Sequence, residues 1–137
     1  MQLFIDSANV DEIREIASWG VLAGVTTNPS LAAKEQRDFT EMLSEICAIV
    51  DGDVSAEVVA TDTAGMLAEA EPLLAVSDKV TIKLPLTPDG LAACRSLSDR
   101  GVRTNVTLCF SATQAILAAA FSGFDRHDGP TRAEVRP

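Results

Sequence analysis

The chain has 137 residues, of which 47% are hydrophobic and 23% charged, and this length and composition fit one globular domain. Eleven Lys and Arg against 20 Asp and Glu give a net charge of -9, which argues against nucleic acid and against an anionic membrane surface as partners. Three cysteines without a C-x-x-C spacing encode neither a disulfide framework nor a zinc site. We expect them to be reduced and to fill space as small apolar side chains.

Other sequence signals favour a cytoplasmic protein. No basic stretch or long apolar run precedes Asp6, so we predict no secretory signal. No apolar run reaches the roughly 18 residues of a membrane span. The single histidine, His127, lies in a polar segment, which argues against a His-centred metal site and against a Ser–His–Asp triad.

Short apolar runs alternate with helical patterns along the chain, which is typical of βα units. The predicted strands cover residues 3–6, 21–26, 54–59, 80–84 and 102–108. Helices are predicted to begin near Asn9, Asp38, Asp62, Thr87 and Ser111, and all of these except Asp62 are predicted as capping residues.

Three local features that end or interrupt these elements are predicted. Residues 27–30 are expected to form a turn after the second strand. Gly52 suits a left-handed cap at the end of the helix that begins at Asp38. Pro72 is expected to break or kink the helix over residues 62–75.

The periodic pattern ends near residue 120. We therefore predict an α/β domain over residues 1–120 and an irregular or disordered tail over residues 121–137. Five βα units fit a doubly wound parallel sheet, and they also fit the first five-eighths of an eight-stranded barrel. The pattern alone leaves both architectures open.

Polar residues fall at or near the carboxyl ends of the predicted strands, where both architectures build their sites. Strands of a parallel sheet are covered on both faces and are expected to be apolar, so each exception is informative. The exceptions recur about once per βα unit and should meet on one rim; they are Asp6, Asn28, Glu57, Lys83, Asn105 and Thr107.

Two of these residues have a direct structural alternative. Lys83 stands between Ile82 and Leu84, where burial favours a neutral, nucleophilic amine, but a strand-end lysine could also extend its amine to water. Asp6 could simply cap the first helix.

The remaining polar residues have structural alternatives too. Glu57 could be a structural partner of Lys83, and Asn28 could serve only the turn that follows it. Asn105 and Thr107 could be ordinary polar residues of a strand. Their occurrence on successive strands favours the functional interpretation.

Five segments, in this order, resemble transaldolase, and specifically the short bacterial type close to the fructose-6-phosphate aldolases. They are Phe-Ile-Asp-Ser-Ala-Asn at 4–9, Gly-Val-Thr-Thr-Asn-Pro-Ser at 24–30, Ser-Ala-Glu-Val at 55–58, Thr-Ile-Lys-Leu-Pro at 81–85 and Thr-Asn-Val-Thr-Leu at 104–108. The resemblance covers residue 1 to about residue 120. It implies a (β/α)8 barrel that works through a lysine Schiff base.

The resemblance also implies roles for individual residues. Lys83 matches the Schiff-base lysine and Asp6 the acid–base aspartate. Glu57 matches a glutamate that acts through a water, and Thr107 a threonine that helps to hold that water. The related aldolases are expected to carry Gln at the position of Glu57, so the glutamate favours transaldolase.

Three further residues are implied to bind substrate. Asn28 and Asn105 match residues that hold the dihydroxyacetone hydroxyls, and Thr26 matches a position that lines the site. The resemblance implies no metal or organic cofactor. The partners that it implies for this chain are small sugar phosphates of the pentose phosphate pathway. A homo-oligomer is compatible with the resemblance.

The last residues depart from the family pattern. A sixth strand is expected to carry a Ser-Pro-Phe-type segment and a phosphate-binding arginine, and residues 121–137 do not resemble it. We therefore expect a partial barrel of about five βα units, truncated or frame-shifted after residue 120, with weak phosphate binding.

Three rival interpretations stay open. One is a fructose-6-phosphate aldolase that releases free dihydroxyacetone, against which Glu57 argues. Another is an inactive barrel fragment. The third is a flavodoxin-like receiver or binding module, which would place its lysine after the fifth strand, whereas Lys83 lies on the fourth.

Overall fold

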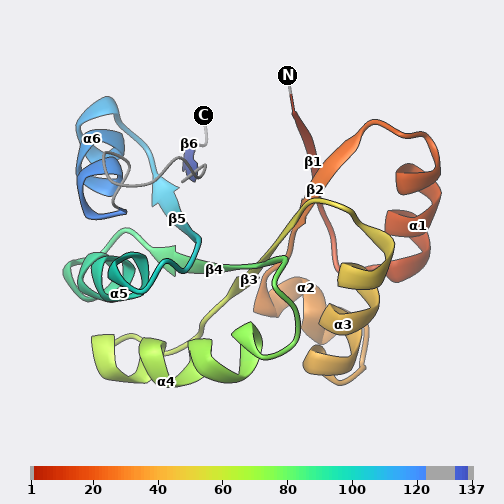
Figure 1. Cartoon of the computed structure of the whole chain (residues 1–137), viewed down its shortest axis with the longest axis horizontal. Coiled ribbons are helices and arrows are strands. Elements are labelled where there is room, and N and C mark those ends of the chain that lie inside the picture. The colour runs from red at the N-terminus through yellow and green to blue at the C-terminus, as the bar shows by residue number, and fades with distance from the viewer. Residues whose placement is uncertain (1, 123–131, 136–137) are drawn as a thin grey trace. The chain divides into compact units, whose positions relative to one another are not determined.

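The computed structural model describes residues 2–122 and 132–135. Strands and helices alternate along these residues (Figure 1). The strands are β1 (Leu3–Asp6), β2 (Leu22–Thr26), β3 (Asp53–Glu57), β4 (Val80–Pro85), β5 (Thr104–Cys109) and β6 (Arg132–Val135). The helices are α1 (Val10–Ser18), α2 (Pro29–Lys34), α3 (Phe39–Ile49), α4 (Thr63–Leu74), α5 (Pro88–Asp99) and α6 (Ala112–Phe121).

The chain divides into two compact units. Unit 1 consists of Met1–Glu57 and Pro72–Thr81, and unit 2 consists of Val58–Glu71 and Ile82–Pro137. The boundaries therefore cut through α4 and β4.

In unit 1, β1, β2 and β3 run parallel in that order. Lys79 extends the pairing beyond β3, because its carbonyl accepts a hydrogen bond of 3.0 Å from the N–H of Val54. Helix α3 packs against both α1 and β3. The largest fully buried side chains of this unit are Ile13, Val25, Met42, Leu43, Ile46, Val50 and Val54.

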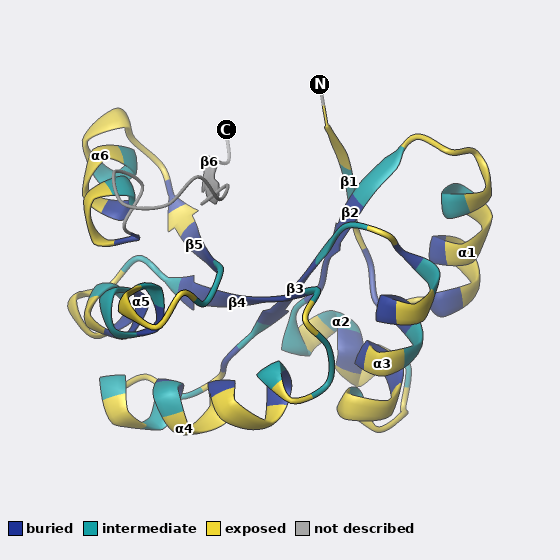
Figure 2. Ribbon diagram, viewed as in Figure 1, coloured by how far each residue is buried: buried dark blue, intermediate teal, exposed yellow. Residues whose placement is uncertain are grey.

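In unit 2, β4, β5 and β6 run parallel in that order. Helix α5 packs against β5 and α6. Strand β4 is buried along nearly its whole length, as expected of a parallel strand (Figure 2). The core of this unit includes Met66, Ile82, Leu84, Ala93, Cys94 and Leu97.

Side-chain caps confirm the predicted helix starts. Asn9, Asp38, Thr87 and Ser111 each accept a hydrogen bond from the N–H three residues further on, and Asp62 does the same at α4. Each cap satisfies an N–H that the first helical turn leaves without a partner in the helix. These starts are therefore fixed by local chemistry.

Residues 28–30, predicted as part of a turn, instead open the short helix α2. Asn28 is its N-cap and accepts a hydrogen bond of 2.9 Å from the N–H of Leu31, and Pro29 occupies the first turn. Proline is favoured there because its missing N–H would have no partner within the helix. The segment 27–30 was therefore a helix start that the sequence pattern was too short to reveal.

Two other predictions need correction. Helix α4 continues through Pro72 to Leu74, so the predicted break does not occur, because a proline in the last turn removes only one hydrogen bond of the helix; a kink there stays a prediction. Gly52 has no positive φ, and α3 ends in an extended conformation at Val50. A glycine is required at position 52 because a Cβ would collide with the carbonyl of Ala23.

The last predicted element, the tail over 121–137, is described only in part. Helix α6 ends at Phe121, close to the predicted limit. Residues 132–135 form β6, which pairs with β5, although an irregular segment was predicted there. The alternation of charged and apolar residues over these four positions suits a strand but is too short to predict one. Residues 123–131 and 136–137, with His127, lie outside the described residues.

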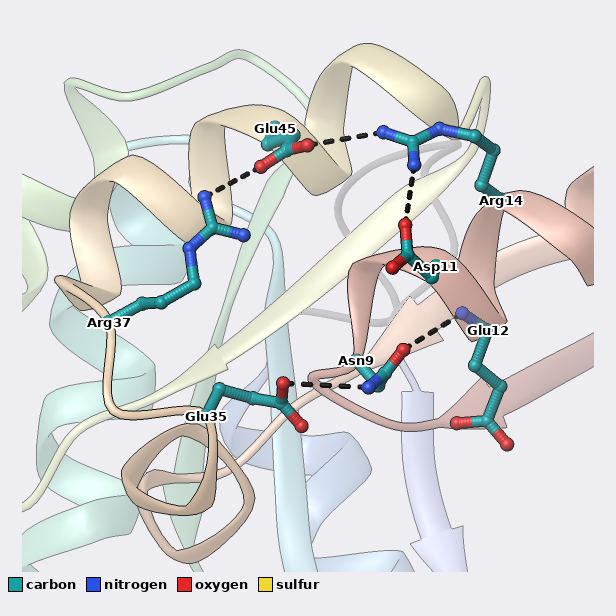
Figure 3. Close-up of polar contacts among 7 residues, drawn as sticks. All are labelled: Asn9, Asp11, Glu12, Arg14, Glu35, Arg37 and Glu45. Atoms are coloured by element: carbon teal, nitrogen blue, oxygen red, sulfur yellow. Dashed lines mark hydrogen bonds and ion pairs between the residues drawn. The ribbon is translucent and has the colours of Figure 1, made fainter.

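The surface of unit 1 carries a network of charges (Figure 3). Glu45 on α3 accepts hydrogen bonds from Arg37 at 2.8 Å and from Arg14 at 3.1 Å, and Arg14 also pairs with Asp11 at 2.8 Å. The hydrogen bond from Arg37 is the largest cause of the lowered pKa of Glu45. The network therefore ties α1 and the segment before α3 to one carboxylate on α3.

The cysteines are buried free thiols, as the sequence predicts. Burial raises the pKa of Cys47 and of Cys94, so both thiols stay protonated at neutral pH. Among the described residues, no helix is both long enough and apolar enough to cross a membrane.

Candidate active site

In unit 1, the structure brings Asp6 and Thr26 together. They are partners in the parallel register of β1 and β2, and the Thr26 hydroxyl donates a hydrogen bond of 3.1 Å to the Asp6 carboxylate. Thr26 is only 4% exposed, whereas Asp6 is exposed. A buried hydroxyl thus orients a carboxylate that water and solutes can reach.

Glu57 lies on the same face of this sheet. Thr26 is in register with Ser55 of β3, and Glu57 follows Ser55 by two residues. Because side chains alternate along a strand, Ser55 and Glu57 point to one side. Glu57 is half-buried at the end of β3.

The chain that follows Asp6 is held by short polar contacts. The Ser7 N–H donates to the Thr26 carbonyl at 3.1 Å, and the Ser7 hydroxyl donates to Glu12 at 2.6 Å. Asn9 is the N-cap of α1. The capping role that the sequence left open for Asp6 therefore belongs to Asn9.

Asn28 is half-buried, and its side-chain oxygen accepts the N–H of Leu31 as the cap of α2. The structural role that the sequence allowed for this residue is thus present. The amide NH₂ of Asn28 takes no part in this cap.

In unit 2, Lys83 lies in the interior of β4. It is 2% exposed, and Ile82 and Leu84 on either side are fully buried. Its register partner on β5 is Asn105, which is also 2% exposed. The alternative in which this lysine extends its amine to water is therefore wrong.

Thr107 follows Asn105 by two residues on β5, so the two side chains share a face with Lys83. Thr107 is 3% exposed, and its carbonyl accepts a hydrogen bond of 3.0 Å from the N–H of Leu86. The structure thus gathers an amine, an amide and a hydroxyl on one buried face of unit 2.

The other two lysines of the chain are placed differently. Lys34 is exposed in the last turn of α2. Lys79 donates from its amine to the carbonyls of Cys47 at 3.0 Å and Val50 at 2.8 Å, at the end of α3. Among the three lysines, Lys83 is the one whose side chain is buried within a strand.

Leu108, next to Thr107, has a positive φ of 63°. The register between β5 and β6 shifts between Val106 and Cys109, which leaves one extra residue on β5. This is a β-bulge, a feature that can redirect a neighbouring side chain. Sequence reasoning missed it, because leucine gives no signal for a left-handed conformation.

Among residues 2–122 and 132–135, no group of three or more His, Cys, Asp or Glu side chains is arranged to hold a metal ion. The polar groups described above are instead carboxylates, an amide and a hydroxyl in unit 1, and an amine, an amide and a hydroxyl in unit 2. These groups can add to a carbonyl, move protons and bind hydroxyls.

A family model described as Transaldolase/Fructose-6-phosphate aldolase matches residues 3–131. The chain belongs to this family. Its relatives include proteins named "Probable transaldolase" from Brevibacillus brevis, Alkaliphilus metalliredigens and Erythrobacter litoralis, with 62%, 57% and 60% identity over 119 residues. The match covers 87% of this chain and 55–56% of each relative. The chain thus spans about half the length of the curated relatives it matches.

The family match confirms the resemblance that the five sequence segments carry. Together with parallel strands that alternate with helices, it also confirms the predicted fold class, a partial (β/α)8 barrel. The flavodoxin-like alternative is therefore excluded.

Proposed function

We propose that this chain performs transaldolase chemistry, in which Lys83 forms a Schiff base with a ketose phosphate and carries its dihydroxyacetone unit to an aldose phosphate. The observation that supports this most is the 2% exposure of Lys83, within an apolar strand of a transaldolase-family chain. A lysine kept from water is the usual form of a Schiff-base nucleophile. Transaldolase is also the name that the relatives carry.

The proposed reaction begins with attack of the Lys83 amine on the ketose carbonyl. Glu57, through a water that Thr107 helps to hold, supplies and removes the protons needed to expel hydroxide and form the iminium. Asp6 then takes the proton of the C4 hydroxyl, the C3–C4 bond breaks, and its electron pair moves into the iminium. The dihydroxyacetone unit stays on Lys83 until an aldose accepts it, which is a ping-pong scheme.

The remaining residues are proposed to bind and orient. The hydrogen bond from the buried Thr26 hydroxyl fixes one oxygen of the Asp6 carboxylate and thereby sets the orientation of that carboxylate. Asn105, in register with Lys83, is placed to hold a hydroxyl of a sugar attached to that lysine. Asn28 is proposed to donate from its amide NH₂. No cofactor is needed for these steps.

We further propose fructose 6-phosphate and sedoheptulose 7-phosphate as donors, and with them a place in the pentose phosphate pathway in the cytoplasm. The net charge of -9 speaks against nucleic acid as a partner. A homo-oligomer is compatible with this proposal.

Borohydride trapping tests the proposal directly. The chain is incubated with fructose 6-phosphate, reduced with borohydride, digested and mapped by mass spectrometry. We expect a dihydroxyacetone adduct on Lys83, none in Lys83→Met, and an unchanged adduct in the matched surface variant Lys34→Met. An adduct on Lys34 or Lys79 with Lys83 unmodified would refute the assignment, and no adduct at all would favour an inactive barrel fragment.

A lyase related to fructose-6-phosphate aldolase is the second candidate, since the family includes that activity. The two differ in the fate of the dihydroxyacetone unit. Transaldolase consumes more than one equivalent of fructose 6-phosphate per site only when an acceptor such as erythrose 4-phosphate is present, because the first equivalent leaves its dihydroxyacetone unit on the lysine. Release of free dihydroxyacetone without an acceptor, at a rate equal to that with one, would favour the lyase.

A further inference from the structure

A single carboxylate fastens the chain just beyond the end of β3. One oxygen of Glu69, on α4, accepts hydrogen bonds from two successive backbone N–H groups, that of Val59 at 2.6 Å and that of Ala60 at 3.1 Å. Successive N–H groups aimed at one point form a natural binding site for a negative charge. The chain fills this site with its own carboxylate.

The residue before this clamp is fixed as well. The N–H of Val58 donates to the carbonyl of Lys83 at 3.3 Å, and Val58 is buried. Three successive N–H groups, at 58, 59 and 60, therefore have defined acceptors. Glu57 directly precedes them in the chain, so its own backbone is held from the carboxyl-terminal side.

Helix α4 is a firm support for this contact. Its first turn is fastened to α5, because the Thr63 hydroxyl donates to the Asp89 carboxylate at 2.8 Å and the Thr63 N–H donates to the same oxygen at 3.2 Å. Asp62 caps Gly65 at 2.9 Å. These contacts do not involve Glu69, so a change at Glu69 should release the loop without melting the helix.

We propose that Glu69 is a positioning residue for the reaction of Glu57: by clamping Val59 and Ala60 it sets the direction in which Glu57 presents its carboxylate. This inference rests on the proposed function. Glu69 itself touches no reacting atom in the scheme above. Its effect arises because a carboxylate that moves protons through a water must be held within a narrow range of positions.

Two substitutions and one control test the clamp. Glu69→Ala removes both hydrogen bonds, whereas Glu69→Gln keeps the shape and an acceptor but loses the charge. Glu71→Gln is the matched control, because Glu71 lies two residues away on the same helix and pairs with Arg100 at 2.6 Å. The measurements are kcat and KM for dihydroxyacetone transfer, amide hydrogen exchange at Val59 and Ala60, and thermal unfolding.

We expect kcat to fall about 10- to 100-fold in Glu69→Ala and less in Glu69→Gln, with KM little changed, as for a displaced catalytic group. Amide exchange at Val59 and Ala60 should accelerate in both variants. Glu71→Gln should leave kcat and these exchange rates unchanged.

The proposal is overturned if Glu69→Ala keeps the wild-type kcat, or if kcat falls while exchange at Val59 and Ala60 stays slow. If the wild-type chain forms no adduct on Lys83, the proposed function fails, and the proposed role of Glu69 in that reaction fails with it. Hydrogen exchange then still shows whether Glu69 holds these two amides, so the two failures are distinguishable.

Discussion

Asp6 in unit 1 and Lys83 in unit 2, the two charged residues at the centre of the proposed reaction, are held in opposite ways. Asp6 is exposed and is held by a hydrogen bond from Thr26. In unit 2 the amine of Lys83 is on a strand that water hardly reaches. The contrast fits the proposed reaction, in which the Asp6 carboxylate exchanges a proton with the substrate and the Lys83 amine attacks a carbonyl.

The largest effect is expected from Asp6→Asn, which tests the role of the accessible carboxylate. The amide keeps the shape but cannot take the C4 proton, so cleavage of fructose 6-phosphate should slow by about 100-fold or more. Addition of dihydroxyacetone itself to Lys83 needs no C–C cleavage and should persist. The measurement is borohydride trapping with each of the two sugars, and equal losses with both would contradict the role of Asp6.

The next effect concerns Lys79, the residue before β4, whose amine donates to carbonyls at the end of α3. Its amine holds two carbonyls, at Cys47 and Val50, so Lys79→Met should lower the free energy of unfolding by about 1–3 kcal/mol. The exposed Lys34→Met should change it by less than about 0.5 kcal/mol. Urea unfolding measures the free energy of unfolding of both variants. Equal losses in Lys79→Met and Lys34→Met would contradict a stabilising role of the Lys79 hydrogen bonds.

A smaller effect is expected at the bulge of unit 2. A left-handed conformation costs any non-glycine residue about 1–2 kcal/mol, and a β-branched residue more. Because the wild-type leucine already bears the first cost, Leu108→Val should be destabilising only by the additional cost of β-branching, which is smaller. Leu108→Gly should be closer to the wild type because glycine adopts φ of 63° without strain. Thermal unfolding checks the order, and a valine variant more stable than the glycine variant would show that no strain is stored there.

The smallest effect concerns the exposed network of unit 1. The pKa of Glu45 is lowered in the folded chain, first by the hydrogen bond from Arg37, so its stabilising contribution is present above its unfolded pKa and is lost as pH falls through its folded pKa. Glu45→Gln should therefore lower Tm slightly at neutral pH and not at strongly acidic pH. High salt should reduce the difference because both partners are exposed. A difference that persists in acid would contradict this assignment.

Local chemistry was sufficient to predict much of the fold. The caps at Asn9, Asp38 and Ser111 depend on neighbours within three residues, so their positions could be predicted from sequence. The burial of Lys83 followed from its apolar neighbours along the strand. Helix α2 was missed because its six residues are too few to show a helical period.

Contacts between distant segments could not be predicted in the same way. The hydrogen bond from Thr26 to Asp6 depends on the register of two strands, and the clamp of Glu69 on Val59 depends on how a loop returns to a helix. The bulge at Leu108 depends on pairing with β6, a strand for which the sequence carried no recognisable signal. Each of these needs three-dimensional coordinates.

The scarcity of lysine has a practical consequence for chemical labelling. With one side-chain amine in solvent, one engaged by helix carbonyls and one enclosed in a strand, a general acylating reagent should modify Lys34 fastest and Lys83 slowest. A ketose that the site recognises should reverse that order. Peptide mapping would identify which lysine each reagent modifies. It would thus show whether the chain recognises the ketose, without an assay of turnover.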